Sequence, residues 1–152
     1  MNWYKQSQSR VFYHGSDSEE IIGPLVTGER DSGWFGSGFY LSAYPVYANR
    51  WGKNIYYVAV PDGLKFAEAS VIGNYEEIIF AGDAQKADEM AGGSNAWIEN
   101  EQVYSDKIKS ALQEMGYGGI KVHFGNNKDV EVVVFDPSQL EVKGRVEEGE
   151  LV

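Results

Sequence analysis

The chain has 152 residues, of which 43% are hydrophobic and 24% charged, values that suit one soluble globular domain with a core of its own. A net charge of −10 repels phosphate backbones and disfavours general nucleic-acid binding, and the lack of cysteine excludes disulfides and thiol chemistry. Because the sequence has no metal-ligand spacing, no long apolar run and no signal peptide, we expect no bound metal and a cytoplasmic location, in the producing cell or a host cell, with secretion left open.

The first half of the chain has the pattern of short strands separated by turns. β-formers run from Val11 to His14, and Pro45 and Gly52 mark the start and the end of a short helix. After a polar lead-in over 1–10, we expect strands over 11–14, 39–42, 54–60 and, more weakly, 64–67, with short helices over 19–22 and about 44–51.

The second half adds a longer helix and a hairpin. Residues 75–90 predict one or two helices broken at Gly82, and an apolar stripe predicts an amphipathic helix over 102–115. Strands are expected over 119–124, 130–135 and 140–142, with a turn over 125–129 and a charged tail over 144–152. We find no repeat and no linker, so residues 1–152 are interpreted as a single α+β domain.

The glycine-rich stretch Gly33–Ser42 combines aromatic rings with glycines that allow close approach of a partner. On a strand, Phe39 and Leu41 would face one way, and Tyr40 and Ser42 the other. One interpretation is a loop that leads into a buried strand, with rings that only pack against the strand over 54–60. The other is a platform on which a planar ring stacks.

Three polar side chains stand where apolar ones would be expected: His14, Tyr40 and Glu131. A carboxylate inside the apolar run Val130–Phe135 costs several kcal/mol if it is unpaired. Glu131 could instead face water on an edge strand, and His14 alone could be a buried structural histidine.

Together, in order, these residues resemble the His-Tyr-Glu class of ADP-ribosyltransferases, which includes diphtheria-type toxins and poly(ADP-ribose) polymerases. The matching motifs are Tyr13–Ser16, Gly33–Ser42 and Glu131–Asp136. The resemblance covers Val11 to about Val142, except for residues 67–100, and compact bacterial and phage-encoded members have this size. It implies two packed antiparallel β-sheets that form a split NAD cleft, with short flanking helices.

The resemblance also implies roles. The family breaks the bond between nicotinamide and ribose in NAD through an oxocarbenium-like transition state, whose positive charge a carboxylate stabilises. Glu131 would be that carboxylate, His14 would hold the adenosine ribose, the Gly15 backbone would bind the nicotinamide amide, and Tyr40 would stack on the ring. The implied NAD site further includes Ser16, Trp34 and Gly38.

The opposite face of the nicotinamide is assigned less sharply. Tyr47 and Trp51 both occupy the corresponding place, and we favour Tyr47. In a sibling class, an acid two residues before the catalytic glutamate engages acceptor arginines; His14 and Tyr40 argue against that class, so Asp129 is interpreted as a loop residue.

The predicted function is therefore transfer of ADP-ribose from NAD to a macromolecular acceptor, most simply a protein. The alternatives are an NAD glycohydrolase on the same scaffold and a non-catalytic NAD- or ADP-ribose-binding module. A weaker third option is an inhibitory partner whose acidic surface imitates a polyanion. The oligomeric state is left open.

Overall fold

The structure, a computed structural model, describes residues 10–16, 32–33, 36–37, 39–48, 52–72, 77–93, 96, 99–125 and 129–146. The strands are β1 (Arg10–Ser16), β2 (Ser32–Gly33), β3 (Gly36–Ser37), β4 (Phe39–Ser42), β5 (Asn54–Val60), β6 (Phe66–Ile72), β7 (Glu77–Ala81), β8 (Gly119–Phe124), β9 (Val130–Val134) and β10 (Glu141–Arg145). The helices are α2 (Pro45–Ala48), α3 (Asp83–Met90), α5 (Glu101–Glu114) and the 3-10 helix η3 (Pro137–Gln139).

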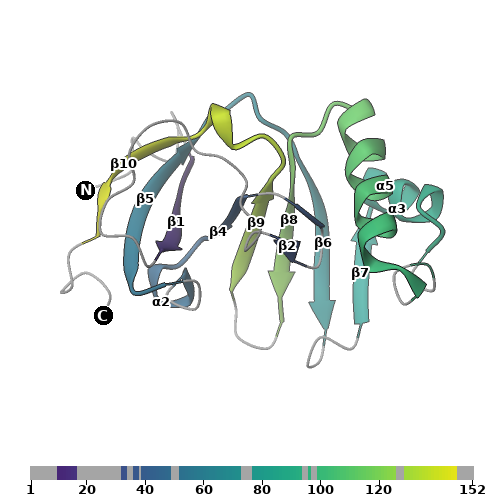
Figure 1. Cartoon of the computed structure of the whole chain (residues 1–152), viewed down its shortest axis with the longest axis horizontal. Coiled ribbons are helices and arrows are strands. Elements are labelled where there is room, and N and C mark those ends of the chain that lie inside the picture. Colours follow the sequence, from purple (N-terminus) through teal and green to yellow (C-terminus); the bar gives the residue numbers. More distant parts are fainter. Residues whose placement is uncertain are drawn as a thin grey trace.

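Eight strands form one twisted sheet in the order β10-β5-β1-β4-β9-β8-β6-β7 (Figure 1). All neighbouring strands are antiparallel except β6 and β8, which run parallel because β7, α3 and α5 intervene between them in the chain. The short strands β2 and β3 pair separately.

This continuous mixed sheet contradicts the predicted pair of packed antiparallel sheets. The two halves are joined where β1 pairs with β4 through Tyr13 and Ser42. Residue alternation predicts where a strand lies and which side chains it buries, but strands far apart in the sequence carry no local signal of their pairing partners. The residue pattern therefore located most of the strands, whereas the two-sheet assembly implied by the resemblance is wrong.

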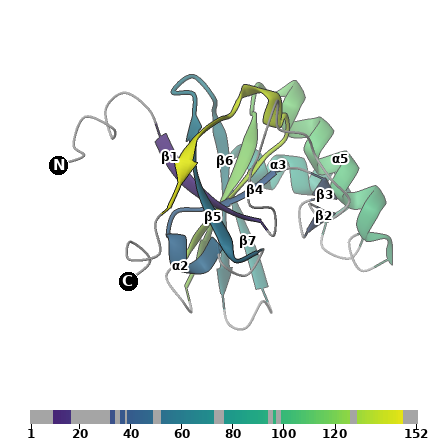
Figure 2. The ribbon, with the colours of Figure 1, turned by 60° about the vertical axis from the view of Figure 1, so that its left-hand side comes forward.

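The two faces of the sheet carry different core clusters. On one face, Tyr40, Ile120 and Val133 belong to a cluster that α3 and α5 complete (Figure 2). Phe39 and Leu41 belong to a second cluster, which confirms that they point away from Tyr40. A third and smaller cluster joins α2 to β5.

Most predicted elements are present, with corrections at their bounds. The strands at 11–14, 54–60, 119–124 and 130–135 and the helix at 102–115 are confirmed to within about two residues. The predicted helix over 75–90 is wrong over 77–81, where β7 forms because Ile78 and Phe80 pack inward while Ile79 is exposed, and residues 75–76 lie outside the described residues. The predicted strand at 64–67 is the start of the longer β6, and the last strand, predicted over 140–142, continues to Arg145. The predicted helix at 19–22 and residues 49–51 lie outside the described residues.

Candidate functional site

The three residues of the predicted triad lie on three adjacent strands in the middle of the sheet. His14 is on β1, Tyr40 on β4 and Glu131 on β9. Tyr13 pairs with Ser42, and Ser42 pairs with Glu131, so these residues form one row across the strands. Because β9 lies between β4 and β8, the alternative that Glu131 sits on an edge strand is wrong.

Tyr40 and Glu131 share a face of the sheet. Tyr40 pairs with Val133, and Glu131 lies two residues before Val133, so Tyr40 and Glu131 are diagonal neighbours within reach of long side chains. Glu131 is half-buried. Tyr40 is only 6% exposed and belongs to the core cluster under α3 and α5, a cluster without a described residue of β5. Tyr40 therefore packs as a core ring in this cluster, and its stacking role stays a prediction.

His14 lies in the join between β1 and β4. Its ring stacks on Phe39, with centroids 4.1 Å apart, and its Nδ1 lies 2.9 Å from the carbonyl oxygen of Tyr40. A carbonyl only accepts, so Nδ1 carries a proton and Nε2 is the acceptor of the neutral ring. Strand alternation sends the imidazole to the face opposite Tyr13, Ser42 and Glu131. The structure thus brings His14 to the backbone of Tyr40 and not to its ring.

The ladder between β1 and β4 is short. In the described part of these strands Tyr13–Ser42 is their only residue pair, whereas β1 and β5 pair along the whole of β1. The Ala43 N–H bonds to β9, so by alternation Tyr40 and Ser42 direct their backbone groups to β1. Gly15 correspondingly directs its N–H and C=O toward β4, at the point where pairing has stopped.

Gly15 also has a structural reason to be glycine. A Cβ at this position would lie 1.9 Å from the carbonyl oxygen of Ala48, the last residue of α2. The absence of a side chain lets α2 pack directly on β1. Tyr47 is a half-buried residue of α2, so it belongs to the helix that packs over Gly15. Its ring packs edge-to-face against Tyr44, with centroids 6.1 Å apart.

The remaining predicted site residues are only partly described. Ser16 ends β1 opposite Asn54 and is half-buried. Trp34, Gly38 and Trp51 lie outside the described residues, so the choice between Tyr47 and Trp51 stays open.

A buried polar pair next to Glu131 escaped the sequence analysis. The Ser42 hydroxyl donates a 2.6 Å hydrogen bond to Oδ1 of Asp129, and the exposed fractions of the two residues are 0% and 1%. Asp129 is a loop residue, as predicted, and directly precedes β9. The sequence does place Asp129 two residues before Glu131. Its partner Ser42 is 87 positions away, however, and local sequence patterns do not indicate contacts over that separation.

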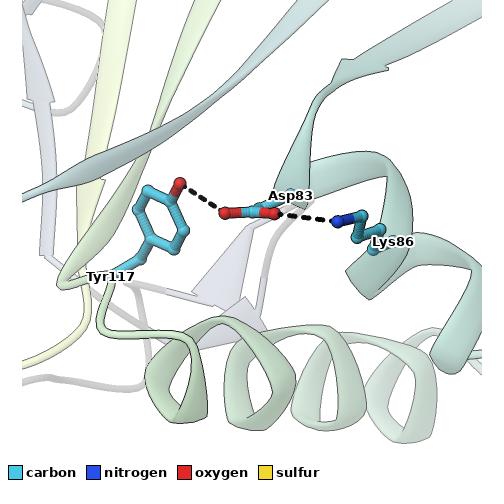
Figure 3. Close-up of polar contacts among 3 residues, drawn as sticks. All are labelled: Asp83, Lys86 and Tyr117. Atoms are coloured by element: carbon cyan, nitrogen blue, oxygen red, sulfur yellow. Dashed lines mark hydrogen bonds and ion pairs between the residues drawn. The ribbon is translucent and has the colours of Figure 1, made fainter.

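A second polar cluster lies at the other end of the molecule and fastens α3. Tyr117 donates a 2.7 Å hydrogen bond to Asp83, whose other oxygen lies 3.6 Å from Lys86 Nζ (Figure 3). The hydrogen bond from Tyr117 holds the pKa of Asp83 below its usual value, and the same bond raises the pKa of Tyr117. These contacts tie the first turn of α3 to the start of β8, which is a structural role.

Two kinds of feature are absent from the described residues. They contain no group of three or more His, Asp or Glu side chains arranged to hold a metal ion. None of the helices among them has the length and apolar character needed to span a membrane.

Comparison with known proteins gives only distant similarities. No family model and no curated protein matches the sequence. Among solved structures, the chain is similar to an anti-CRISPR protein, with a TM-score of 0.48 and 18% identity over 92% of this chain and 97% of the other. It is also similar to a chain of the M. tuberculosis MbcT–MbcA toxin–antitoxin complex, with a TM-score of 0.46 and 15% identity over 91% of this chain and 83% of the other. At these scores neither similarity enters the functional assignment.

Proposed function

We propose that the chain is an NAD-dependent ADP-ribosyltransferase that cleaves the nicotinamide–ribose bond and transfers ADP-ribose to a macromolecular acceptor. The observation that carries this proposal is the half-buried Glu131 on an interior strand, next to Tyr40 on one side of the sheet. Burying part of a carboxylate in such a strand costs desolvation free energy, which favours a functional reason for keeping it.

The proposed roles follow from chemistry. As the C1′–N bond breaks, its electron pair leaves with nicotinamide and positive charge develops on the ribose. The Glu131 carboxylate opposes that charge, which lowers the barrier because the interaction is stronger in the transition state than in the ground state. The acceptor nucleophile then bonds to C1′ and loses its proton.

The join between β1 and β4 supports a binding role for the neighbouring residues. The Gly15 backbone presents a donor and an acceptor where strand pairing has ended, which matches the two hydrogen-bonding groups of a carboxamide. The His14 ring lies on the face opposite Glu131, where Nδ1 donates to the Tyr40 carbonyl, so the contact of His14 with the adenosine ribose is proposed from the resemblance alone.

The burial of the Tyr40 ring supports a second candidate function. A ring that is 6% exposed offers little of its face to a planar ligand, so a module that binds NAD or ADP-ribose without turnover is the second candidate. An NAD glycohydrolase would use the same site with water as acceptor.

The test is incubation of the purified protein with adenylate-labelled NAD, with and without a cell lysate, followed by separation of the products. Transfer predicts release of nicotinamide and label on macromolecules of the lysate. Free ADP-ribose as the only labelled product would favour the glycohydrolase. Saturable NAD binding without nicotinamide release would favour the non-catalytic module. The absence of both NAD binding and nicotinamide release would contradict the proposal.

A further inference from the structure

Ser42 and Asp129 stand out as a buried polar pair at the place where β4 ends and β9 begins. Ser42 pairs with Glu131 across the strands, and its hydroxyl donates to Asp129, two residues before Glu131. One serine thus contacts the chain at the proposed catalytic carboxylate and two residues before it.

Further hydrogen bonds tie the same corner together. The Tyr44 N–H donates to the Ser42 hydroxyl at 3.1 Å, and the Ala43 N–H donates to the Val130 carbonyl at 2.8 Å. The Asp129 carbonyl accepts from the Phe124 N–H at 2.9 Å. Ser42 therefore connects the chain leading into α2 with the chain leading into β9.

We propose that Ser42 and Asp129 are positioning residues for the NAD-cleaving reaction, which act by holding Glu131 in register beside Tyr40. This inference rests on the function proposed above. Electrostatic stabilisation depends on preorganised geometry, because a carboxylate displaced from the ribose loses much of its effect in the transition state. A pair that fixes the chain immediately before Glu131 supplies that preorganisation.

The depth of the pair argues for a functional role over a purely stabilising one. A carboxylate that is 1% exposed is costly to bury, and apolar residues of similar volume often stabilise a core as well or better. The same depth argues against contact between Asp129 and a macromolecular acceptor. The exposed Ser138–Asp136 pair has the same 2.6 Å Oγ–Oδ1 bond, lies beyond the C-terminal end of β9, whereas Glu131 is near its start, and serves as a matched control.

The experiment measures nicotinamide release by Ser42→Ala and by Glu131→Gln, singly and together, with Ser138→Ala as the control. We expect Ser42→Ala to lower kcat about tenfold or more, because a hydrogen bond to a charged group is lost, with the KM for NAD changed less than about threefold. When Glu131 is already Gln, the additional Ser42→Ala should change the residual rate less than about twofold. Ser138→Ala should leave the kinetics unchanged.

A second variant guards against loss of folding. Asp129→Asn keeps an acceptor oxygen and the side-chain volume, so it should retain at least about fivefold more activity than Asp129→Ala. Equal losses in these two variants would overturn the positioning role, as would an undiminished effect of Ser42→Ala in the Glu131→Gln background. If Glu131→Gln abolishes release while Ser42→Ala leaves kcat unchanged, the inference fails and the proposed function stands. No release by the wild type overturns both.

Discussion

The contact between Gly15 and α2 gives a direct test of how the candidate site is assembled. An alanine Cβ at position 15 would lie 1.9 Å from the Ala48 carbonyl oxygen and 3.1 Å from that of Gly52. Both are backbone atoms, so no side-chain rotation can relieve the overlap. Gly15→Ala must therefore push α2 away from β1.

The expected cost is large. Overpacking of a well-packed site costs typically about 1–3 kcal/mol, and a backbone clash belongs at the upper end, so we expect a loss of about 3 kcal/mol in the free energy of unfolding. For a chain of this size that corresponds to a fall in Tm of roughly 6–12 °C. Urea denaturation and thermal unfolding, both followed by tryptophan fluorescence, measure these quantities.

Gly144 on β10 provides the matched control, since no atom lies within 4 Å of the corresponding Cβ position. Gly144→Ala should change the stability by less than about 0.5 kcal/mol. If Gly15→Ala unfolds at the wild-type temperature, α2 does not pack on β1 as described. The placement of Tyr47 beside the candidate site would then lose its basis.

Three further predictions test separate contacts. His14→Ala should lose about 1–3 kcal/mol of stability, because it removes the hydrogen bond to the Tyr40 carbonyl and the stacking on Phe39. It should also weaken NAD binding, measured by calorimetry. An unchanged NAD affinity per folded molecule would leave His14 only its structural role. In thermal unfolding, 3-aminobenzamide at millimolar concentration should raise the Tm of the wild type but not that of Tyr40→Ala, and no shift in the wild type would count against a nicotinamide slot. Tyr117→Phe should lower the Tm at neutral pH, because it removes the hydrogen bond to the Asp83 carboxylate. The Tm difference from the wild type should shrink as the pH falls through the depressed pKa of Asp83, below the ordinary value of 3.8, because protonation removes the charged form that the bond favours. A Tm difference that stays constant on acidification would refute this linkage.

The sequence predicted local structure better than assembly. The strand over 54–60 and the helix over 102–115 follow from residue type and periodicity, which are local properties. The region 77–81 was assigned to a helix because the run Glu-Ile-Ile-Phe-Ala fits either period when it is short. The pairing of β1 with both β5 and β4, which makes one sheet, depends on contacts between distant segments, and the two separate sheets that the resemblance implied are wrong.

In the candidate site, too, local features could be predicted from the sequence, whereas contacts between distant segments could not. That Tyr40 and Glu131 occupy one side of neighbouring strands agrees with the ordered motifs, although their chemical roles stay predictions. The resemblance assigned the backbone of position 15 to the nicotinamide amide, and the structure adds a reason for glycine there, the nearby Ala48 carbonyl. The partnership of Ser42 with Asp129 could not be predicted, because two short polar residues form a site only after the fold brings them together.

The most direct test of the central proposal compares nicotinamide release from NAD by the wild type, Glu131→Gln and Glu141→Gln, with NAD affinity measured in parallel. Glu141 also lies on a strand but is exposed and paired with Lys143 at 3.2 Å, so its substitution should change neither quantity. We predict that Glu131→Gln stays folded, binds NAD with an affinity within about threefold of the wild type and releases nicotinamide at least about 10²-fold more slowly. Release at the wild-type rate by Glu131→Gln would contradict the assignment of Glu131 as the catalytic carboxylate.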